Sequence, residues 1–300
     1  MKLKYLILFL LVIFILYSVS AQAQWARLYA NAPKHSNFIE ITPASSASNT
    51  WLDPSIPTQY RSRYNSVSLA YIFTFPLFQK KSAGLGIIIP AAHVLSYNES
   101  TSIVNLNTGG MGDISFSFDQ NLWGGPSMTK EVFEKTPAQT YSGIHFLFTI
   151  PTGKYSVQNE NNIGSNRYSL KATYQYTQVW NKGDIQLDFY GGTTFFGDNT
   201  QYLDTNTLSE DVLVDVQAHF SYNFTPVAWA EVGAMWSGGG KTYTNGVQRS
   251  NSQNNYVGVL GIGTRAWKGC SFFFIYNNTL FYPDNTPDTE NMIVQFLQIF

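Results

Sequence analysis

Long runs of strictly alternating side chains are the feature of this sequence that most restricts its fold. Between Asp211 and Phe224 every second residue is apolar, beginning with Val212, and the residues between them are polar except for Leu213. Successive side chains of a β-strand point to opposite faces, so this run has one apolar face and one polar face. A helix would mix the two sets. The pattern predicts a strand that separates an apolar environment from an aqueous one.

Twelve segments show this alternation, and several are longer than the five or six residues of a usual soluble strand. They match the ~9–11 residues that a tilted strand needs to cross a bilayer. The first of them has the weakest pattern. The segments are 37–42, 67–77, 83–97, 110–122, 140–150, 167–180, 184–196, 211–224, 227–237, 255–267, 271–281 and 291–300.

The links between these segments alternate in length. Outer-membrane barrels join their strands by short periplasmic turns and long extracellular loops. One link, 124–139, is long where a short turn is expected. We interpret it as a small periplasmic excursion, and the strand count is least certain there. The short links are 79–81, 181–183, 225–226 and 268–269, and the long polar stretches are 43–66, 98–109, 151–166, 197–210, 238–254 and 282–290.

The composition agrees with a wall between lipid and water. Charged residues make up 12% of the chain and aromatic residues 16%, whereas about a quarter of a soluble domain is charged. Lipid offers no hydrogen bonds, so every strand must be paired on both edges, which requires a closed sheet. A soluble β-sandwich is the alternative, with its aromatic faces inward. We predict an all-β fold, a transmembrane antiparallel β-barrel of about 12 strands, in the outer membrane of a Gram-negative bacterium.

The start of the sequence has the three regions of a secretory signal peptide. Two lysines come before an apolar run over residues 5–19, and the small-residue triplet Ala-Gln-Ala follows at 21–23. We expect cleavage after Ala23, so that residues 1–23 are a signal peptide and residues 24–300 form the barrel. A single membrane-anchoring helix is the alternative, because the apolar run is long for a signal.

Ionisable residues on the polar faces are the candidate site residues, because an aqueous lumen tolerates them. One interpretation is a lumen whose charges select what passes. The other is that the charges pair across neighbouring strands and fill the interior, and both can hold together. The consecutive strands that carry four of them predict an ionic network of Lys171, Asp188, Asp215 and Glu231. The lumen-facing candidates are Asp113, Asp119, His145, Lys171, Asp188, Asp215, Glu231 and Arg265.

Aromatic residues near the predicted strand ends fit the girdles of Tyr and Trp that mark both membrane interfaces. By contrast, Trp229 and Phe273 have the inward phase, which suggests an apolar route for hydrophobic solutes. The residues expected near the interfaces are Tyr71, Phe73, Trp123, Tyr168, Trp180, Tyr190, Trp236 and Trp267.

No pattern in the sequence favours an enzyme. Some twelve-stranded barrels are phospholipases that use a His-x-Ser arrangement on one strand face. Here His35 and Ser36 are adjacent, so a strand would point them to opposite faces, whereas a serine nucleophile needs its base within hydrogen-bond reach. There is no metal-ligand spacing, no phosphate loop and no basic stripe for nucleic acid. We therefore expect no cofactor and no nucleic-acid partner.

The end of the chain resembles the signal that barrel-assembly machinery reads. Met292, Val294, Phe296 and the terminal Phe300 share one face of the last strand, and Gln298 departs from the usual apolar pattern. The expected partners are therefore outer-membrane lipid, the assembly machinery and a small-molecule solute.

Three short stretches resemble the outer-membrane transporters grouped under the MetA pathway of phenol degradation. They are Gly-Met-Gly-Asp at 110–113, Pro-Thr-Gly at 151–153 and Asn-Ile-Gly-Ser-Asn-Arg at 162–167, and the run 188–202 is also similar. The resemblance extends from about Gly109 to the C-terminus. It implies a barrel with a role in uptake of aromatic or other hydrophobic compounds, and it implies no catalytic residue.

The leading hypothesis is therefore an outer-membrane channel for passive uptake of small, aromatic or hydrophobic, solutes. The alternative is a non-conducting barrel that acts as a surface anchor or adhesion scaffold through its polar loops.

Overall fold

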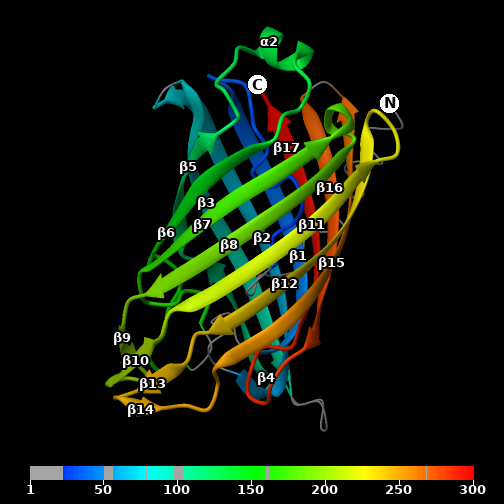
Figure 1. Ribbon diagram of the computed structural model, residues 1–300. Coiled ribbons are helices and arrows are strands. Elements are labelled where there is room, and N and C mark those ends of the chain that lie inside the picture. Colours follow the sequence, from blue (N-terminus) through cyan, green and yellow to red (C-terminus); the bar gives the residue numbers. More distant parts are fainter. Residues whose placement is uncertain (1–22, 51–56, 79, 98–103, 160–161, 268) are drawn as a thin grey trace, which may run out of the picture.

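Strands dominate the computed structural model, which describes residues 23–50, 57–78, 80–97, 104–159, 162–267 and 269–300 (Figure 1). The predicted signal peptide lies outside these residues except for Ala23. The strands are β1 (Asn37–Thr50), β2 (Pro57–Leu77), β3 (Lys81–Tyr97), β4 (Val104–Met111), β5 (Ile114–Trp123), β6 (Tyr141–Ile150), β7 (Ser169–Trp180), β8 (Ile185–Phe196), β9 (Asn199–Tyr202), β10 (Asn206–Glu210), β11 (Leu213–Asn223), β12 (Ala228–Gly239), β13 (Thr242–Thr244), β14 (Val247–Gln248), β15 (Gln253–Trp267), β16 (Cys270–Phe281) and β17 (Thr289–Ile299).

The main sheet is antiparallel and closes on itself. β1 pairs with β2 on one side and with the last strand, β17, on the other, so that Phe38 lies opposite both Ile72 and Ile299. β4 and β5 occupy one position in the wall: β4 pairs with residues 91–97 of β3, and β5 pairs with residues 83–88. The 13 strands of this sheet therefore make a barrel of 12 positions, which confirms the predicted fold and strand number.

The outer face of the barrel is apolar and the inner face is polar. On β11, Val216, Phe220 and Tyr222 are exposed on the outer face, whereas Gln217 and His219 between them are buried. Exposing such a band to water would be unfavourable, but a bilayer covers it without cost in hydrogen bonds. The predicted location in the Gram-negative outer membrane agrees with this surface. No helix in the described part of the chain has the length and apolar character to span a membrane.

The exposed apolar side chains of the outer face form an apolar belt around the barrel. A charge on this belt is expected to destabilise the barrel. Leu260 lies halfway along β15 and is 57% exposed on the outer face. Replacing it by arginine, Leu260→Arg, should cost about 2–4 kcal/mol of folding free energy because the guanidinium must enter the hydrocarbon. Reversible denaturant unfolding in lipid vesicles measures this cost. The matched control is Val247→Arg on β14, beyond the main sheet, for which we expect a change within about 0.5 kcal/mol.

The wall extends further from the periplasm than the sequence predicted. The stretch 43–66 was predicted to be a polar loop, but β1 continues to Thr50 and β2 starts at Pro57, and the two pair through Ser48 and Ser62. Outward side chains above the apolar belt need not be apolar. The alternation that marks a membrane strand is therefore missing from this part of the sequence.

Two other predicted loops carry strands of their own. β9 and β10, within the loop 197–210, and β13 and β14, within 238–254, form a separate four-stranded sheet. This sheet lies at the end of the barrel away from the C-terminus, which is the extracellular end (Figure 1). β4 likewise occupies part of the predicted loop 98–109.

The long link 124–139 lies at the opposite end, beside the C-terminus (Figure 1). It contains the short helix α2 (Lys130–Lys135), which has no buried residue. Gly124 and Gly125 start the link with φ values of 63° and 50°, a conformation that favours glycine. The link adds no strand to the count, and its place beside the C-terminus agrees with the predicted periplasmic excursion.

Candidate functional site

The residues that precede β1 lie inside the barrel. We call residues 24–36 the luminal segment. The backbone N–H of Gln24 donates to Gln217 on β11 at 2.9 Å, and the side chain of Asn31 accepts from Asn121 on β5 at 3.1 Å. The carbonyl of Pro33 accepts from Thr74 on β2 at 2.6 Å. Because these strands lie on different sides of the barrel, the segment crosses the lumen.

Arg27 is the strongest anchor of the luminal segment. Its Nε donates to Ser221 at 3.0 Å and its Nη1 donates to Asn223 at 2.7 Å, both on β11. Its guanidinium carbon lies 5.0 Å from the centre of the Trp229 ring, which is a cation–π distance. Its backbone N–H donates to Asp188 at 3.0 Å. Trp229, predicted to mark an apolar route, thus holds a cation in place.

Tyr29 fixes the middle of the segment. Its ring stacks on His145 with centroids 3.6 Å apart, and it meets the edge of Tyr190 at 5.4 Å. The Tyr29 carbonyl accepts from the Tyr141 hydroxyl, and the Trp25 carbonyl accepts from the Tyr190 hydroxyl. The prediction that Tyr190 belongs to a lipid-interface girdle is therefore wrong, because this side chain is buried in the lumen. Its even position on β8 sets the inward phase.

Four of the predicted residues face the luminal segment or its neighbours. Asp188 accepts from the Thr177 hydroxyl at 2.5 Å as well as from Arg27. Glu231 accepts from the backbone N–H of Ala26. His145 bonds to Asp119 at 2.8 Å and to Gln175 at 2.9 Å.

The predicted ionic network is only partly assembled. Lys171 pairs with Asp215 at 2.7 Å and reaches across β8 to do so. Asp188 and Glu231 instead turn to the luminal segment. Arg265 is exposed near the periplasmic end of β15.

Glycines make room for the large inward side chains. Gly233 lies opposite His219 in the β11–β12 pairing, and Gly261 lies opposite Glu231 in the β12–β15 pairing. A Cβ atom at Gly233 would be 2.2 Å from His219 Nδ1, and one at Gly261 would be 2.4 Å from Glu231 Oε1. Each side chain therefore lies across a neighbouring strand that has no side chain at that point.

Asp113 lies in the break between β4 and β5, where the loop 151–166 begins. It accepts from the backbone N–H groups of Gly153 and Ser165 and from the Ser165 hydroxyl, each at 2.7 Å. Gly153 and Gly164 are in backbone contact, since a Cβ at Gly153 would lie 2.7 Å from the Gly164 Cα. The three motifs of the family resemblance therefore meet in one cluster.

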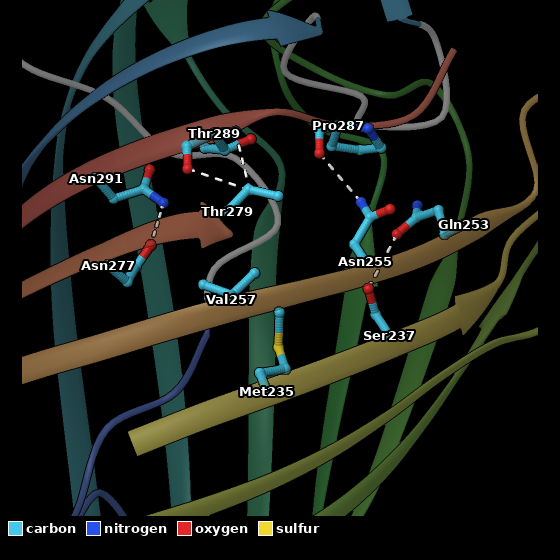
Figure 2. Close-up of a pocket in the computed structure, with 10 residues that line it drawn as sticks. All are labelled: Met235, Ser237, Gln253, Asn255, Val257, Asn277, Thr279, Pro287, Thr289 and Asn291. Atoms are coloured by element: carbon cyan, nitrogen blue, oxygen red, sulfur yellow. Dashed lines mark hydrogen bonds between the residues drawn. The ribbon is translucent and has the colours of Figure 1, made fainter. Parts of the chain in front are cut away.

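A small hollow opens in the extracellular half of the lumen (Figure 2). Its cavity volume of about 20 Å³ is little more than one water molecule requires. The buried side chains of Ala44, Val259, Ile275 and Ile293 form an apolar layer with Met235 and Val257, and Trp25 of the luminal segment packs against it. The hollow is lined by Met235, Ser237, Gln253, Asn255, Val257, Asn277, Thr279, Pro287, Thr289 and Asn291.

Sequence reasoning missed the luminal segment and the amides of the hollow. The segment has no periodicity to find, but its Trp25, Arg27 and Tyr29 are unusual for a flexible linker. Asn255, Asn277 and Asn291 share the polar phase of their strands, which a search for neutral as well as charged inward residues would have found. The search for ionisable groups alone passed over them.

Residues 48–265 match the family described as "Putative MetA-pathway of phenol degradation". This match covers more than half of the sequence. It includes the three motifs that meet at Asp113, which we call the rim cluster. The chain belongs to this family. The predicted resemblance is confirmed, although the match begins earlier than Gly109 and ends before the C-terminus. No curated protein sequence matches the chain.

Solved structures show the fold that this family member shares. The COG4313 outer membrane channel from Pseudomonas putida F1 is 14% identical, with a TM-score of 0.78 over 93% of this chain and 100% of that one. The β domain of the Bordetella autotransporter BrkA is 7% identical, with a TM-score of 0.55 over 89% of this chain and 100% of that one. The first match is to a barrel of nearly the same extent as this one.

Proposed function

We propose that this chain is an outer-membrane channel for passive uptake of small hydrophobic solutes. The observation that carries the proposal is that a separate segment of the chain, and not the barrel wall, fills the lumen. An eight-stranded barrel is just narrow enough for side chains to fill, so a barrel of 12 positions leaves more space. Here the luminal segment occupies that space, held by side-chain contacts to the wall. A segment held in this way can move without the wall unfolding.

The comparisons support transport as the class of function. The similar Pseudomonas putida protein is an outer membrane channel, and the family is described by a pathway of phenol degradation. We propose a channel and not an enzyme. Ser36 is buried, with its N–H bound to Thr74 Oγ1, and the His35 ring packs 6.2 Å from Phe73.

Reconstitution of the purified protein tests the proposal. We expect stepwise single-channel currents in planar bilayers, and faster uptake of a radiolabelled hydrophobic solute by Gram-negative cells that express the protein than by cells without it. The uptake should need no energy source, because the proposed transport is passive diffusion. A silent barrel, with uptake equal to that of the control cells, would contradict the channel.

The alternative of a non-conducting anchor has one observation in its favour. The sheet of β9, β10, β13 and β14 is a folded extracellular platform, more ordered than the polar loops that the sequence predicted. If the barrel is an anchor, removing this platform should abolish surface attachment while currents are absent in every variant. If it is a channel, the currents should survive removal of the platform.

Biogenesis follows from the two ends of the chain. We propose that cleavage after Ala23 releases Gln24 as the mature N-terminus and that barrel-assembly machinery binds the last strand. Met292 is exposed on the outer face of β17, and Phe300, which follows the strand directly, is exposed as well, which supports recognition there. Outer-membrane lipid then covers the apolar belt.

A further inference from the structure

We infer that the mature N-terminus of this chain is a pyroglutamate, a neutral cyclic lactam that Gln24 forms and that Gln217 binds inside the lumen. The inference rests on the proposed cleavage after Ala23, which makes the backbone nitrogen of Gln24 a free α-amine. It goes beyond the channel function, because it assigns a covalent modification to the chain. The luminal segment then begins with an uncharged group in place of an ammonium group.

The carboxamide of Gln217 contacts two atoms of Gln24 at once. The Gln24 backbone N–H donates to Gln217 Oε1 at 2.9 Å, and Gln217 Nε2 donates to Gln24 Oε1 at 3.1 Å. The oxygen and the nitrogen of a carboxamide are attached to the same carbon, so the two Gln24 atoms must lie side by side. The side chain of Gln24 is therefore folded back toward its own backbone nitrogen, which is the arrangement from which the lactam closes.

Ring closure needs no reagent beyond the residue itself. The α-amine attacks the side-chain carbonyl carbon and forms an N–Cδ bond, and the Cδ–Nε2 bond breaks to release ammonia. The amine gives up one proton and the departing nitrogen gains one, so atoms and charge balance. The departing Nε2 already lies against the hydroxyl of Tyr29, whose ring is stacked on His145. This hydroxyl is placed to pass the proton to the departing nitrogen.

The surroundings of Gln217 set its donor and its acceptor for a lactam. Gln217 is buried on β11, and its Nε2 also donates to Asp215 at 2.8 Å. An ionised carboxylate only accepts, so Asp215 fixes which end of the carboxamide is the nitrogen. The Oε1 atom takes a second hydrogen bond from His219 Nε2 at 3.3 Å. Gln217 therefore presents one donor beside one acceptor, the complement of the C=O and N–H that a lactam carries side by side.

Burial disfavours the charged alternative. Ala23 is buried in the apolar layer with Val257 and Ile293, so the nitrogen that cleavage frees borders that layer. An ammonium group there would lose hydration, and it would offer donors only, whereas the Gln217 donor needs an acceptor. The lactam removes the charge and keeps both hydrogen bonds to Gln217. Only the contact of Nε2 with Tyr29 is given up.

The mass of the intact protein tests the modification. Protein purified from outer membranes should have the mass of residues 24–300 less one molecule of ammonia, and chemical sequencing from the N-terminus should be blocked. In Gln24→Asn the shorter side chain cannot close a stable ring, so this variant should keep its ammonia and an open N-terminus. An unsubstituted chain that keeps its ammonia and can be sequenced would overturn the lactam.

Hydrogen exchange tests the place of the lactam. The lactam N–H is followed by NMR in nanodiscs that contain the protein with ¹⁵N-labelled glutamine. Gln217→Met removes both hydrogen bonds and should speed this exchange about tenfold or more. The matched control is Gln295→Met, which removes another buried inward glutamine, one that donates to Glu40 at 3.1 Å, and should leave the exchange unchanged. Heat-modifiable migration on gels verifies that each variant is a folded barrel. Equal exchange in Gln217→Met and the unsubstituted chain would overturn binding by Gln217.

The outcomes keep the inference apart from the proposed channel. A mass that still includes Ala23 would overturn both the cleavage and the lactam, since a nitrogen inside the chain cannot close this ring. None of these results would remove single-channel currents. Absent currents would overturn the channel and would leave the mass and the exchange as they are.

Discussion

Deletion of residues 24–33 is expected to raise the single-channel conductance of the barrel several-fold. The segment crosses the lumen from β11 to β2, so the open cross-section should grow when it is absent. No strand of the wall is removed, because β1 begins at Asn37. Planar-bilayer recordings of the deletion variant and the full chain, made at the same salt concentration, measure the change.

A single substitution should release the segment with less disturbance. Arg27 binds Ser221 and Asn223 and stacks over Trp229. In Arg27→Glu these contacts are lost, and a carboxylate is placed near Asp188 and Glu231. Contacts of this kind stabilise by the order of a few kcal/mol in total, so we expect long open periods at the conductance of the deletion variant.

The controls for this prediction lie outside the lumen. Lys130→Glu makes the same change of charge on α2, which has no buried residue, and should leave the current unaltered. If both luminal variants keep the conductance of the full chain, the segment does not limit the current. The narrowest point would then have to be formed by the wall itself.

The lipid-facing part of the barrel could be predicted because the bilayer imposes a rule on each strand. Val216 and Phe220 face lipid and must be apolar, whereas the alternate residues of β11 face the lumen and can be polar. The sequence of β11 therefore alternates with a period of two. No such rule acts on β1 beyond Thr42 or on the first half of β2. There the buried inward side chains are short and polar, such as Ser46 and Ser62, and the local sequence resembles that of a loop.

The interior was harder to predict because its contacts join distant residues. The phase of β8 and β12 placed Asp188 and Glu231 inward, but nothing in the local sequence indicates that both accept hydrogen bonds from the backbone of residues 26 and 27. A strand pattern tells which way a side chain points and not what it meets. The rim cluster was more accessible, since Asp113 and the glycines beside it were found as motifs before their contact was known.

The ion pair between Arg167 and Glu210 should be the most sensitive point of the extracellular end. Arg167 ends the third rim motif, and Glu210 ends β10 in the extracellular sheet. Their side chains meet at 2.6 Å and are 3% and 1% exposed, and the guanidinium also lies over the Phe196 ring. Arg167→Met removes the guanidinium that binds a buried carboxylate, and breaking a buried pair in this way costs about 3–5 kcal/mol.

Hydrogen exchange measures this loss where it occurs. Amide protection in β10 and β13 should fall by about two to three orders of magnitude in Arg167→Met, since each 1.4 kcal/mol is about a tenfold change. The wall strands should keep their protection. The double variant Arg167→Met/Glu210→Leu should recover most of the loss, because burying two apolar side chains avoids the desolvation of both charges.

A second ion pair supplies the matched comparison. Arg61 and Asp288 meet at 3.0 Å with side chains 23% and 25% exposed, so water still solvates both charges. Arg61→Met should therefore cost about 1 kcal/mol or less. If Arg167→Met is as mild as Arg61→Met, water reaches the Glu210 carboxylate in solution, and the pair does not fix the extracellular sheet to the rim. If only Arg167→Met causes a large loss of stability, the loss results from burial of the charge and not from the ion pair as such.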